Sequence, residues 1–208
     1  ISKDKQVVVS HEAYFSHEIA TTPSGEPITR KNEKEHNIYQ LTYQQIKEYD
    51  VGLRPHARFP QQQNIQAVKP LLKDVIIASD SFAMNNSIKK PFYNIEIKRD
   101  PELGSLFQPS AEEFAQLVID QVEKYSIADR VCLQSFDLET LKAIKRFAPK
   151  LTMALLVENE KSFQENLAEL GFTPDIYGPY FKLISQELVD QCKDKNMLII
   201  HWTVNEEE

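Results

Sequence analysis

The sequence predicts an α/β fold with parallel strands, and three observations predict it. From Glu96 onward, short apolar runs alternate with amphipathic segments, as strands and helices do in parallel α/β proteins. The intervals between these segments are short and regular. Polar residues recur where the predicted strands end: His11, Glu96 with Lys98, Gln134 with Ser135, and the stretch from His201 to Asn205.

Two architectures fit this alternation, an open doubly wound sheet and a (β/α)8 TIM barrel. An open sheet that binds nucleotides commonly carries a G-x-G-x-x-G or P-loop motif after a strand, and the sequence has neither. A barrel places its functional side chains at the C-terminal ends of its strands, where the polar residues recur. We therefore favour the barrel.

The first half of the chain is less regular. The β-branched run Val7–Val9 predicts a buried strand. A polar section over residues 20–37, broken by Pro and Gly, is too long for an ordinary connection and predicts a functional loop or a small insertion. Thr42 is a candidate N-cap for a short helix ending at Ile46. The apolar spacing over residues 71–84 predicts a longer helix.

The second half divides into clear elements. Strands are predicted at 130–136, 151–157, 175–177 and 197–203, in addition to the strand that contains Glu96. The predicted helices each begin after a capping residue: Ser110, Asp137, Ser162 and Ser185.

The strand that contains Glu96 has two different faces. Side chains alternate along a strand, so Asn94, Glu96 and Lys98 point to one side, and Ile95 and Ile97 point to the other. A carboxylate and an ammonium group are thus presented together near the end of the strand. From the pattern alone, an ordinary solvated Glu/Lys face is as good an interpretation as a functional site.

Composition limits the function classes. The 208 residues suffice for one sizeable core or at most two small domains. The net charge of −7 argues against a nucleic-acid-binding surface, and no apolar run approaches the roughly 20 residues that span a bilayer. Cys132 and Cys192 have no C-x-x-C spacing, which argues against a zinc site or a disulfide scaffold. The oligomeric state and the compartment, cytoplasmic or outside the inner membrane, stay open.

Four short motifs occur in order along nearly the whole chain. They are Val7-Val-Val-Ser-His11-Glu12, Ile95-Glu96-Ile97-Lys98, Leu133-Gln-Ser-Phe136 and Trp202-Thr-Val-Asn205. Each motif is weak alone, but their order and spacing are fairly specific. Together they resemble the glycerophosphodiester phosphodiesterase family.

The resemblance implies a (β/α)8 barrel and metal-dependent hydrolysis of small-molecule glycerophosphodiesters to an alcohol and glycerol 3-phosphate. It implies that His11 is one of two catalytic histidines in proton transfer. Glu96 would be a ligand of a divalent metal ion, Ca²⁺ or Mg²⁺, and Lys98 would neutralise the substrate phosphate. The remaining residues that the resemblance places around the substrate are Trp202, Ser135 and Phe136.

The chain also departs from the family pattern. The family's H-R-G and E-x-D motifs would lie upstream of Ile1, an eighth strand is lacking, and Glu12 replaces the usual aspartate. We therefore expect residues 1–208 to be a fragment of a longer enzyme, one phosphodiesterase-type barrel domain. An insertion at about 20–63, after the second strand, would form a lid or selectivity element.

Two other functions remain possible on the sequence. One is another TIM-barrel phosphodiesterase of phospholipid head groups, and the family resemblance leaves open whether water or the substrate's own hydroxyl attacks first. The other is a non-catalytic barrel that serves as a binding module, which the Glu12 departure and the absent motifs would favour. His56, with Arg54 and Arg58 around it, is either an anion-binding loop or an ordinary surface loop.

Overall fold

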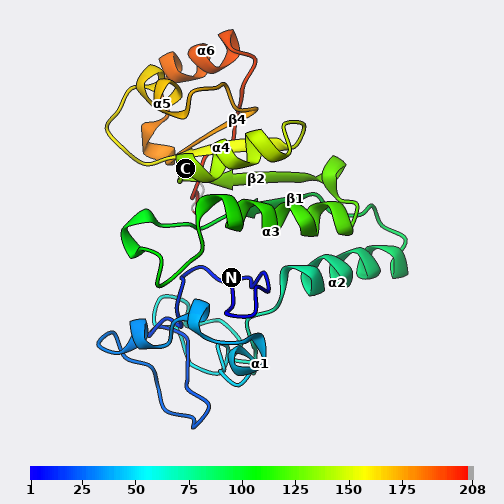
Figure 1. The fold of residues 1–208 in the computed structure, drawn as a ribbon, viewed down its shortest axis with the longest axis vertical. Helices are drawn as coiled ribbons and strands as arrows, with labels where there is room; N and C mark the ends of the chain where they lie inside the picture. The colour runs from blue at the N-terminus through cyan, green and yellow to red at the C-terminus, as the bar shows by residue number, and fades with distance from the viewer. Residues whose placement is uncertain (206–208) are drawn as a thin grey trace. The chain divides into compact units, whose positions relative to one another are not determined.

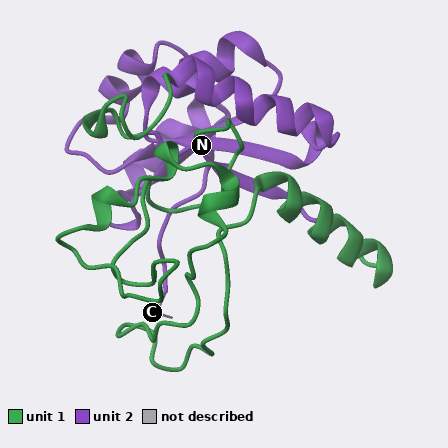
Figure 2. Ribbon diagram, turned by 60° about the horizontal axis from the view of Figure 1, so that its bottom comes forward, with its two compact units in different colours: residues 1–90, 100–110 green, residues 91–99, 111–208 purple. Residues whose placement is uncertain are grey.

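The structure is a computed structural model that describes residues 1–205. It divides into two compact units, coloured separately in Figure 2. Unit 1 comprises Ile1–Lys90 and Asp100–Ser110, and unit 2 comprises Pro91–Arg99 and the chain from Ala111 onward. Within residues 1–205, no helix combines the length and the apolar character needed to cross a membrane.

Unit 2 contains a five-stranded parallel sheet in the order β1-β2-β3-β4-β5. The parallel pairing confirms the predicted α/β class. Strands that follow each other along the chain also pair side by side, as they do in a (β/α)8 barrel. Over residues 1–205 the sheet is open. The strands are β1 Tyr93–Glu96, β2 Val131–Ser135, β3 Thr152–Val157, β4 Ile176–Pro179 and β5 Leu198–Ile199.

Each connection between consecutive strands contains an α-helix, as predicted. Helices α3 and α4 lie over one face of the sheet, where α4 packs on β2 and β3 (Figure 1). The helices of unit 2 are α3 Ala111–Lys124, α4 Leu138–Phe147, α5 Phe163–Leu170 and α6 Gln186–Asp194, with short 3-10 turns η4 Ala128–Arg130 and η5 Phe181–Leu183.

The helix ends follow the sequence signals. The Asp137 side chain accepts a hydrogen bond from the Thr140 backbone N–H at the start of α4. Ser162 and Glu165 form a reciprocal capping box at the start of α5, and Gly171 ends that helix in the left-handed region with φ 83°. Local chemistry therefore fixes where these helices begin and end.

Strand β2 has a buried face and a partly exposed face, whereas β4 and all of β3 after Thr152 are buried on both faces. In β2, Val131, Leu133 and Ser135 are buried, whereas the alternate residues Cys132 and Gln134 are partly exposed. The buried residues lie on the helix-covered side, because α4 packs on β2. Burial also raises the pKa of the Cys132 thiol to about 11, an effect to which the charge of Asp175 adds.

The last strand is shorter than predicted. The sequence indicates a strand over 197–203, but β5 covers only Leu198–Ile199, and Trp202 forms an isolated parallel bridge to Tyr180. Among the residues the structure describes, β5 pairs only with β4, so the backbone on its other side has no strand to hold it. The Trp202 backbone N–H still bonds to the Pro179 carbonyl, at 3.3 Å.

Unit 1 folds around its own apolar cluster. Phe15 stacks on Tyr49 with ring centroids 4.0 Å apart, and the cluster continues with Ala20, Ile28, Ile38 and Ile46. The region predicted as an insertion therefore has a packed core, and its role as a lid remains a prediction. The elements of unit 1 are η1 Glu33–Glu35, η2 Ile38–Gln40, α1 Tyr43–Ile46 with its predicted Thr42 cap, α2 Leu72–Asn85 and η3 Pro101–Leu103.

The strand predicted at Val7–Val9 does not form. The run makes one isolated antiparallel bridge, between Val8 and Leu71, and is not part of the five-stranded sheet. The pairing cannot extend, because Pro70 on one side of the bridge has no backbone N–H and Leu72 on the other side begins α2. The prediction was wrong because the sequence pattern shows strand preference but not the partner.

Candidate functional site

Glu96 and Lys98 meet at the C-terminal end of β1. The Lys98 Nζ lies 3.2 Å from Glu96 Oε1, and both side chains are partly exposed. Ile97, between them, is buried on the opposite face, and its N–H bonds to the Gln134 carbonyl at 2.9 Å, which continues the pairing with β2. The predicted alternation of faces is confirmed, and it presents a carboxylate and an ammonium group side by side.

The neighbouring strand extends this polar face. Glu96 pairs in register with Gln134, and the Asn94 side chain donates to the Gln134 side-chain oxygen at 3.1 Å. Asn94, Glu96, Lys98 and Gln134 thus form a polar strip on the face that the helices leave uncovered.

Ser135 points the other way. It is fully buried, its hydroxyl donates to the Ile97 carbonyl at 2.7 Å, and it accepts from the Asp137 N–H at 3.1 Å. The Ser135 hydroxyl therefore both donates and accepts a hydrogen bond, and these two bonds join the ends of β1 and β2 to the start of α4. Its predicted contact with substrate stays a prediction.

Phe136 and Trp202 form an aromatic cluster with Tyr180. The Phe136 ring meets Trp202 edge to face with centroids 5.3 Å apart, and Tyr180 lies 5.4 Å from Trp202 on another side. The Trp202 Nε1–H donates to the Gly178 carbonyl at 2.9 Å, which fixes the indole. Phe136 remains 40% exposed, so the cluster has an open edge.

Phe136 and Trp202 are in contact although they follow strands that are not neighbours in the sheet. Phe136 follows β2 and Trp202 follows β5, with β3 and β4 between them. In a flat sheet these strands would stand roughly 14 Å apart. The ring centroids are 5.3 Å apart, so the two side chains lean toward each other across β3 and β4. Such convergence is expected on the inside of a barrel.

His11 lies in unit 1, whereas the other five predicted site residues lie in unit 2. Its side chain is 76% exposed, and its Nδ1 is 2.7 Å from Glu12 Oε1. A carboxylate in this position orients the imidazole and leaves Nε2 directed away from the pair. The structure thus gives Glu12, the residue that departs from the family pattern, a contact with the histidine.

A buried lysine lies behind this turn. Lys69 is 5% exposed, and its Nζ donates to the Ser10 hydroxyl at 2.7 Å. The Ser10 hydroxyl in turn donates to the Glu12 carbonyl at 2.6 Å. Burial lowers the pKa of Lys69, and the negative charge of Glu12 acts in the opposite direction.

The loop around His56 is a surface loop with its charges already paired. Arg58 lies 3.0 Å from Glu18, and the His56 ring lies 3.4 Å from the same carboxylate. Arg54 donates to two backbone carbonyls, each at 2.9 Å. These contacts favour the surface-loop interpretation over an anion-binding loop.

The described residues do not make a metal site by themselves. Within residues 1–205, no group of three or more His, Cys, Asp or Glu side chains could hold a metal ion. Glu96 offers one carboxylate, and it already pairs with Lys98, whereas Ca²⁺ and Mg²⁺ take six or more oxygen ligands.

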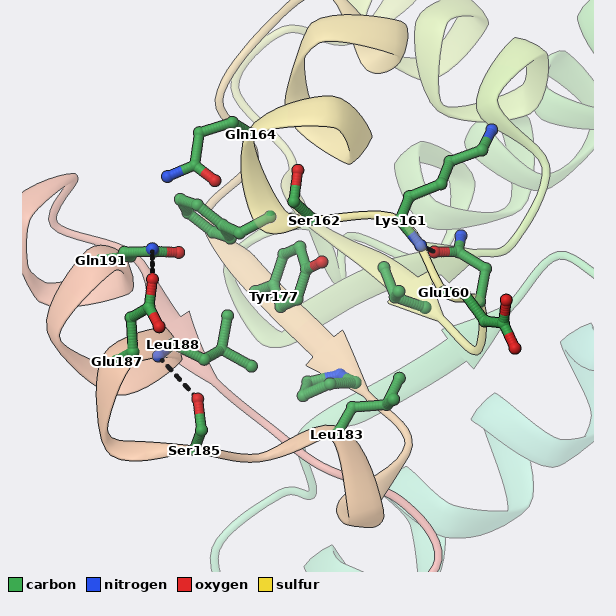
Figure 3. Close-up of a pocket in the computed structure, with 14 residues that line it drawn as sticks. Glu160, Lys161, Ser162, Gln164, Tyr177, Leu183, Ser185, Glu187, Leu188 and Gln191 are labelled. Carbon is green, nitrogen blue, oxygen red and sulfur yellow. Dashed lines mark hydrogen bonds between the residues drawn. The ribbon is translucent and has the colours of Figure 1, made fainter.

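A cavity of about 300 Å³ lies elsewhere in unit 2, between β4 and the helices α5 and α6 (Figure 3). None of the predicted site residues lines it. Its polar groups are paired locally: Lys161 with Glu169 at 2.6 Å, and the Ser185 hydroxyl with the Leu188 N–H at 3.1 Å. The cavity is distinct from the strip around Glu96.

Sequence reasoning missed Lys69 and Tyr180. Lys69 carries no pattern signal, because a lysine is ordinarily exposed and nothing in the sequence shows which one is buried. Tyr180 follows a short predicted strand, so an aromatic residue at a strand end was an available signal.

A parallel sheet of sequentially ordered strands, with charged, amide and aromatic side chains at their C-terminal ends, is the arrangement of a (β/α)8 barrel. The sequence model described as "Glycerophosphoryl diester phosphodiesterase family" matches residues 1–208. The chain therefore belongs to the glycerophosphoryl diester phosphodiesterase family, as the resemblance predicts.

Relatives and solved structures agree with this assignment. A glycerophosphodiester phosphodiesterase from Caldanaerobacter subterraneus subsp. tengcongensis is 26% identical, covering 100% of this chain and 72% of the relative. A crystal structure from Silicibacter pomeroyi DSS-3, provisionally named a glycerophosphoryl diester phosphodiesterase, has a TM-score of 0.81 at 24% identity, over 99% of this chain and 71% of that one. An Oleispira antarctica phosphodiesterase, in complex with the product sn-glycerol-3-phosphate, has a TM-score of 0.69 at 18% identity, over 99% and 70%. These two structures are similar in fold.

Proposed function

We propose that the protein hydrolyses glycerophosphodiesters to an alcohol and glycerol 3-phosphate, with Glu96 and Lys98 at the reacting phosphate. The observation that carries the proposal is the Glu96–Lys98 pair at the C-terminal end of β1, where a barrel has its active site. The membership of the family and the product held by the Oleispira antarctica relative support the substrate class.

The proposed chemistry follows from the charge that develops. Attack on a phosphodiester builds negative charge on the phosphoryl oxygens, and the Lys98 ammonium would offset it. The leaving alkoxide needs a proton, which the imidazole of His11 would supply near neutral pH. Phe136 and Trp202 would form an apolar wall beside the glycerol or the head group.

The metal requirement is a separate part of the proposal. Glu96 would supply one oxygen ligand to Ca²⁺ or Mg²⁺, and the remaining ligands must come from groups other than a preformed cluster in residues 1–205. Such an ion, when bound, would withdraw charge from the phosphoryl oxygens. The dependence on a metal is thus a prediction for the full-length protein.

The test is hydrolysis of glycerophosphocholine and glycerophosphoethanolamine by the full-length protein, with and without EDTA. Glu96→Gln keeps the shape of the side chain and should lower kcat/KM by about a hundredfold or more. The exposed Glu123, near the C-terminal end of α3, provides the matched control. Glu123→Gln removes the same charge and should change kcat/KM by less than about twofold, because surface substitutions away from a site have small effects. Full activity of Glu96→Gln, or no turnover of either diester by the wild type, would refute the proposal.

A further inference from the structure

Lys69 is the one buried lysine among residues 1–205. The chain around it runs along the Val7–Val9 segment: the Val9 N–H bonds to the Pro70 carbonyl at 2.9 Å, and Val8 bridges to the residue after Pro70. This antiparallel pairing brings Lys69 next to Ser10, the residue that follows the segment.

The hydrogen bonds at Lys69 have a fixed direction. An ammonium group only donates, so the Ser10 oxygen accepts from Nζ at 2.7 Å. The single proton of the Ser10 hydroxyl is then free to donate to the Glu12 carbonyl at 2.6 Å. The lysine therefore orients the hydroxyl that closes the turn from Ser10 to Glu12, and His11 lies within that turn.

Burying the Lys69 ammonium costs desolvation free energy, and the packing at this position does not need a charged residue. Nζ lies 5.5 Å from the centroid of the buried Phe15 ring, in surroundings that lower the pKa of the lysine. An apolar residue of similar length would fill the same space without the desolvation of a charge. The ammonium group instead lies within the electrostatic influence of Glu12, whose carboxylate contacts His11 Nδ1 at 2.7 Å.

We propose that Lys69 is a positioning residue for His11, which acts through Ser10 and Glu12. It fixes the turn backbone through the Ser10 hydroxyl and holds the Glu12 carboxylate by charge, and Glu12 in turn orients the imidazole. This inference rests on the proposed function, which assigns proton transfer to His11. Groups behind a reacting side chain are expected to set its geometry, since small displacements have large effects on rate.

The kinetic test uses Lys69→Met in the full-length protein, with glycerophosphocholine as substrate. Methionine keeps most of the buried stem and removes the ammonium, so kcat should fall about tenfold or more while KM changes by less than about twofold. Lys3, an exposed lysine of the same unit, provides the control: Lys3→Met removes the same charge and should leave both constants unchanged. Ser10→Ala should reproduce part of the loss, and the double variant should lose less than the sum of the two single losses, because both side chains hold the same turn.

A second readout does not depend on catalysis. The imidazole signals of His11, identified by their loss in His11→Gln, can be recorded by ¹H–¹⁵N NMR at one fixed pH. Lys69→Met removes the group that holds Ser10, so the turn should loosen and the contact between Glu12 and His11 Nδ1 should change. The His11 signals should therefore shift in Lys69→Met. Lys3→Met should not shift them.

Some outcomes separate this inference from the proposed function. An unchanged kcat and unchanged His11 NMR signals in a Lys69→Met protein of normal melting temperature would overturn the inference, as would simple additivity with Ser10→Ala. If Lys69→Met lowers the melting temperature strongly, Ser10→Ala, which removes one hydroxyl, decides in its place. If His11→Ala keeps full activity while Lys69→Met still shifts the His11 NMR signals, positioning is supported and the proposed function fails.

Discussion

Asp50 shows how much one side chain organises in unit 1. Its carboxylate accepts backbone N–H bonds from Gly52, Leu53 and Ala67 at 3.0, 2.7 and 2.9 Å, which closes the loop between residues 53 and 66. Burial alone would raise the pKa of this carboxyl. The three N–H groups outweigh burial and bring the pKa below its ordinary 3.8.

The lowered pKa of Asp50 predicts that the free energy of unfolding depends on pH. A carboxylate whose pKa is lower in the folded state stabilises the fold above its unfolded pKa of 3.8, and this contribution is lost as the pH falls through the folded value. At pH 7, Asp50→Asn should reduce the free energy of unfolding by about 1 kcal/mol. Urea unfolding should show that the difference in the free energy of unfolding between Asp50→Asn and wild type becomes smaller below about pH 4. A difference that is constant from pH 7 to pH 3 would contradict this account.

At the scale of elements, the junction of β1, β2 and α4 is held by Asp137. Its carboxylate accepts from the Thr140 hydroxyl at 2.6 Å as well as from the N–H at the start of α4, and it pairs with Arg99 at 2.9 Å. The helix N-cap therefore also neutralises a cation that follows directly after Lys98. The junction thus stabilises the strand end that carries the candidate site.

Removing this carboxylate should be much more costly than removing a simple cap. Asp137→Ala leaves the Arg99 guanidinium largely buried without its partner and should lower the free energy of unfolding by about 3 kcal/mol or more. Ser162→Ala, at the exposed start of α5, removes only a cap and should cost about 1 kcal/mol. Urea unfolding followed by the fluorescence of Trp202, the single tryptophan, measures both. Equal losses would show that the ion pair contributes nothing.

At the scale of the whole molecule, residues 1–205 contain the fold elements and part of the candidate site, without a preformed cluster of ligands for a cation. Residues 1–205 contain no cluster of three potential ligands, although Glu96 occupies the strand end where the resemblance expects one. We therefore expect residues 1–205 to bind Ca²⁺ or Mg²⁺ no tighter than about 1 mM by isothermal titration calorimetry. EDTA should not change their melting temperature. Micromolar binding that Glu96→Gln abolishes would contradict this prediction and show that Glu96 binds the ion together with further ligands.

The sequence by itself determined the parallel α/β class, the caps and ends of most helices, and the pairing of faces around Glu96 and Lys98. These features depend on local chemistry: side chains alternate along a strand, Asp and Ser cap helices, and Gly171 adopts a positive φ. A short stretch of residues is sufficient to specify each of them.

Tertiary structure alone decided which segments found partners. The Val7–Val9 run has strong strand preference, but it pairs at one bridge because its neighbour is a proline followed by a helix. Ser135 and Phe136 are adjacent, yet one is buried in the strand junction and the other reaches Trp202 across β3 and β4. Lys69 contacts the turn around His11 through its hydrogen bond to Ser10, which lies 59 residues away in the sequence. Burial and long-range pairing depend on the whole chain, which a local pattern does not contain.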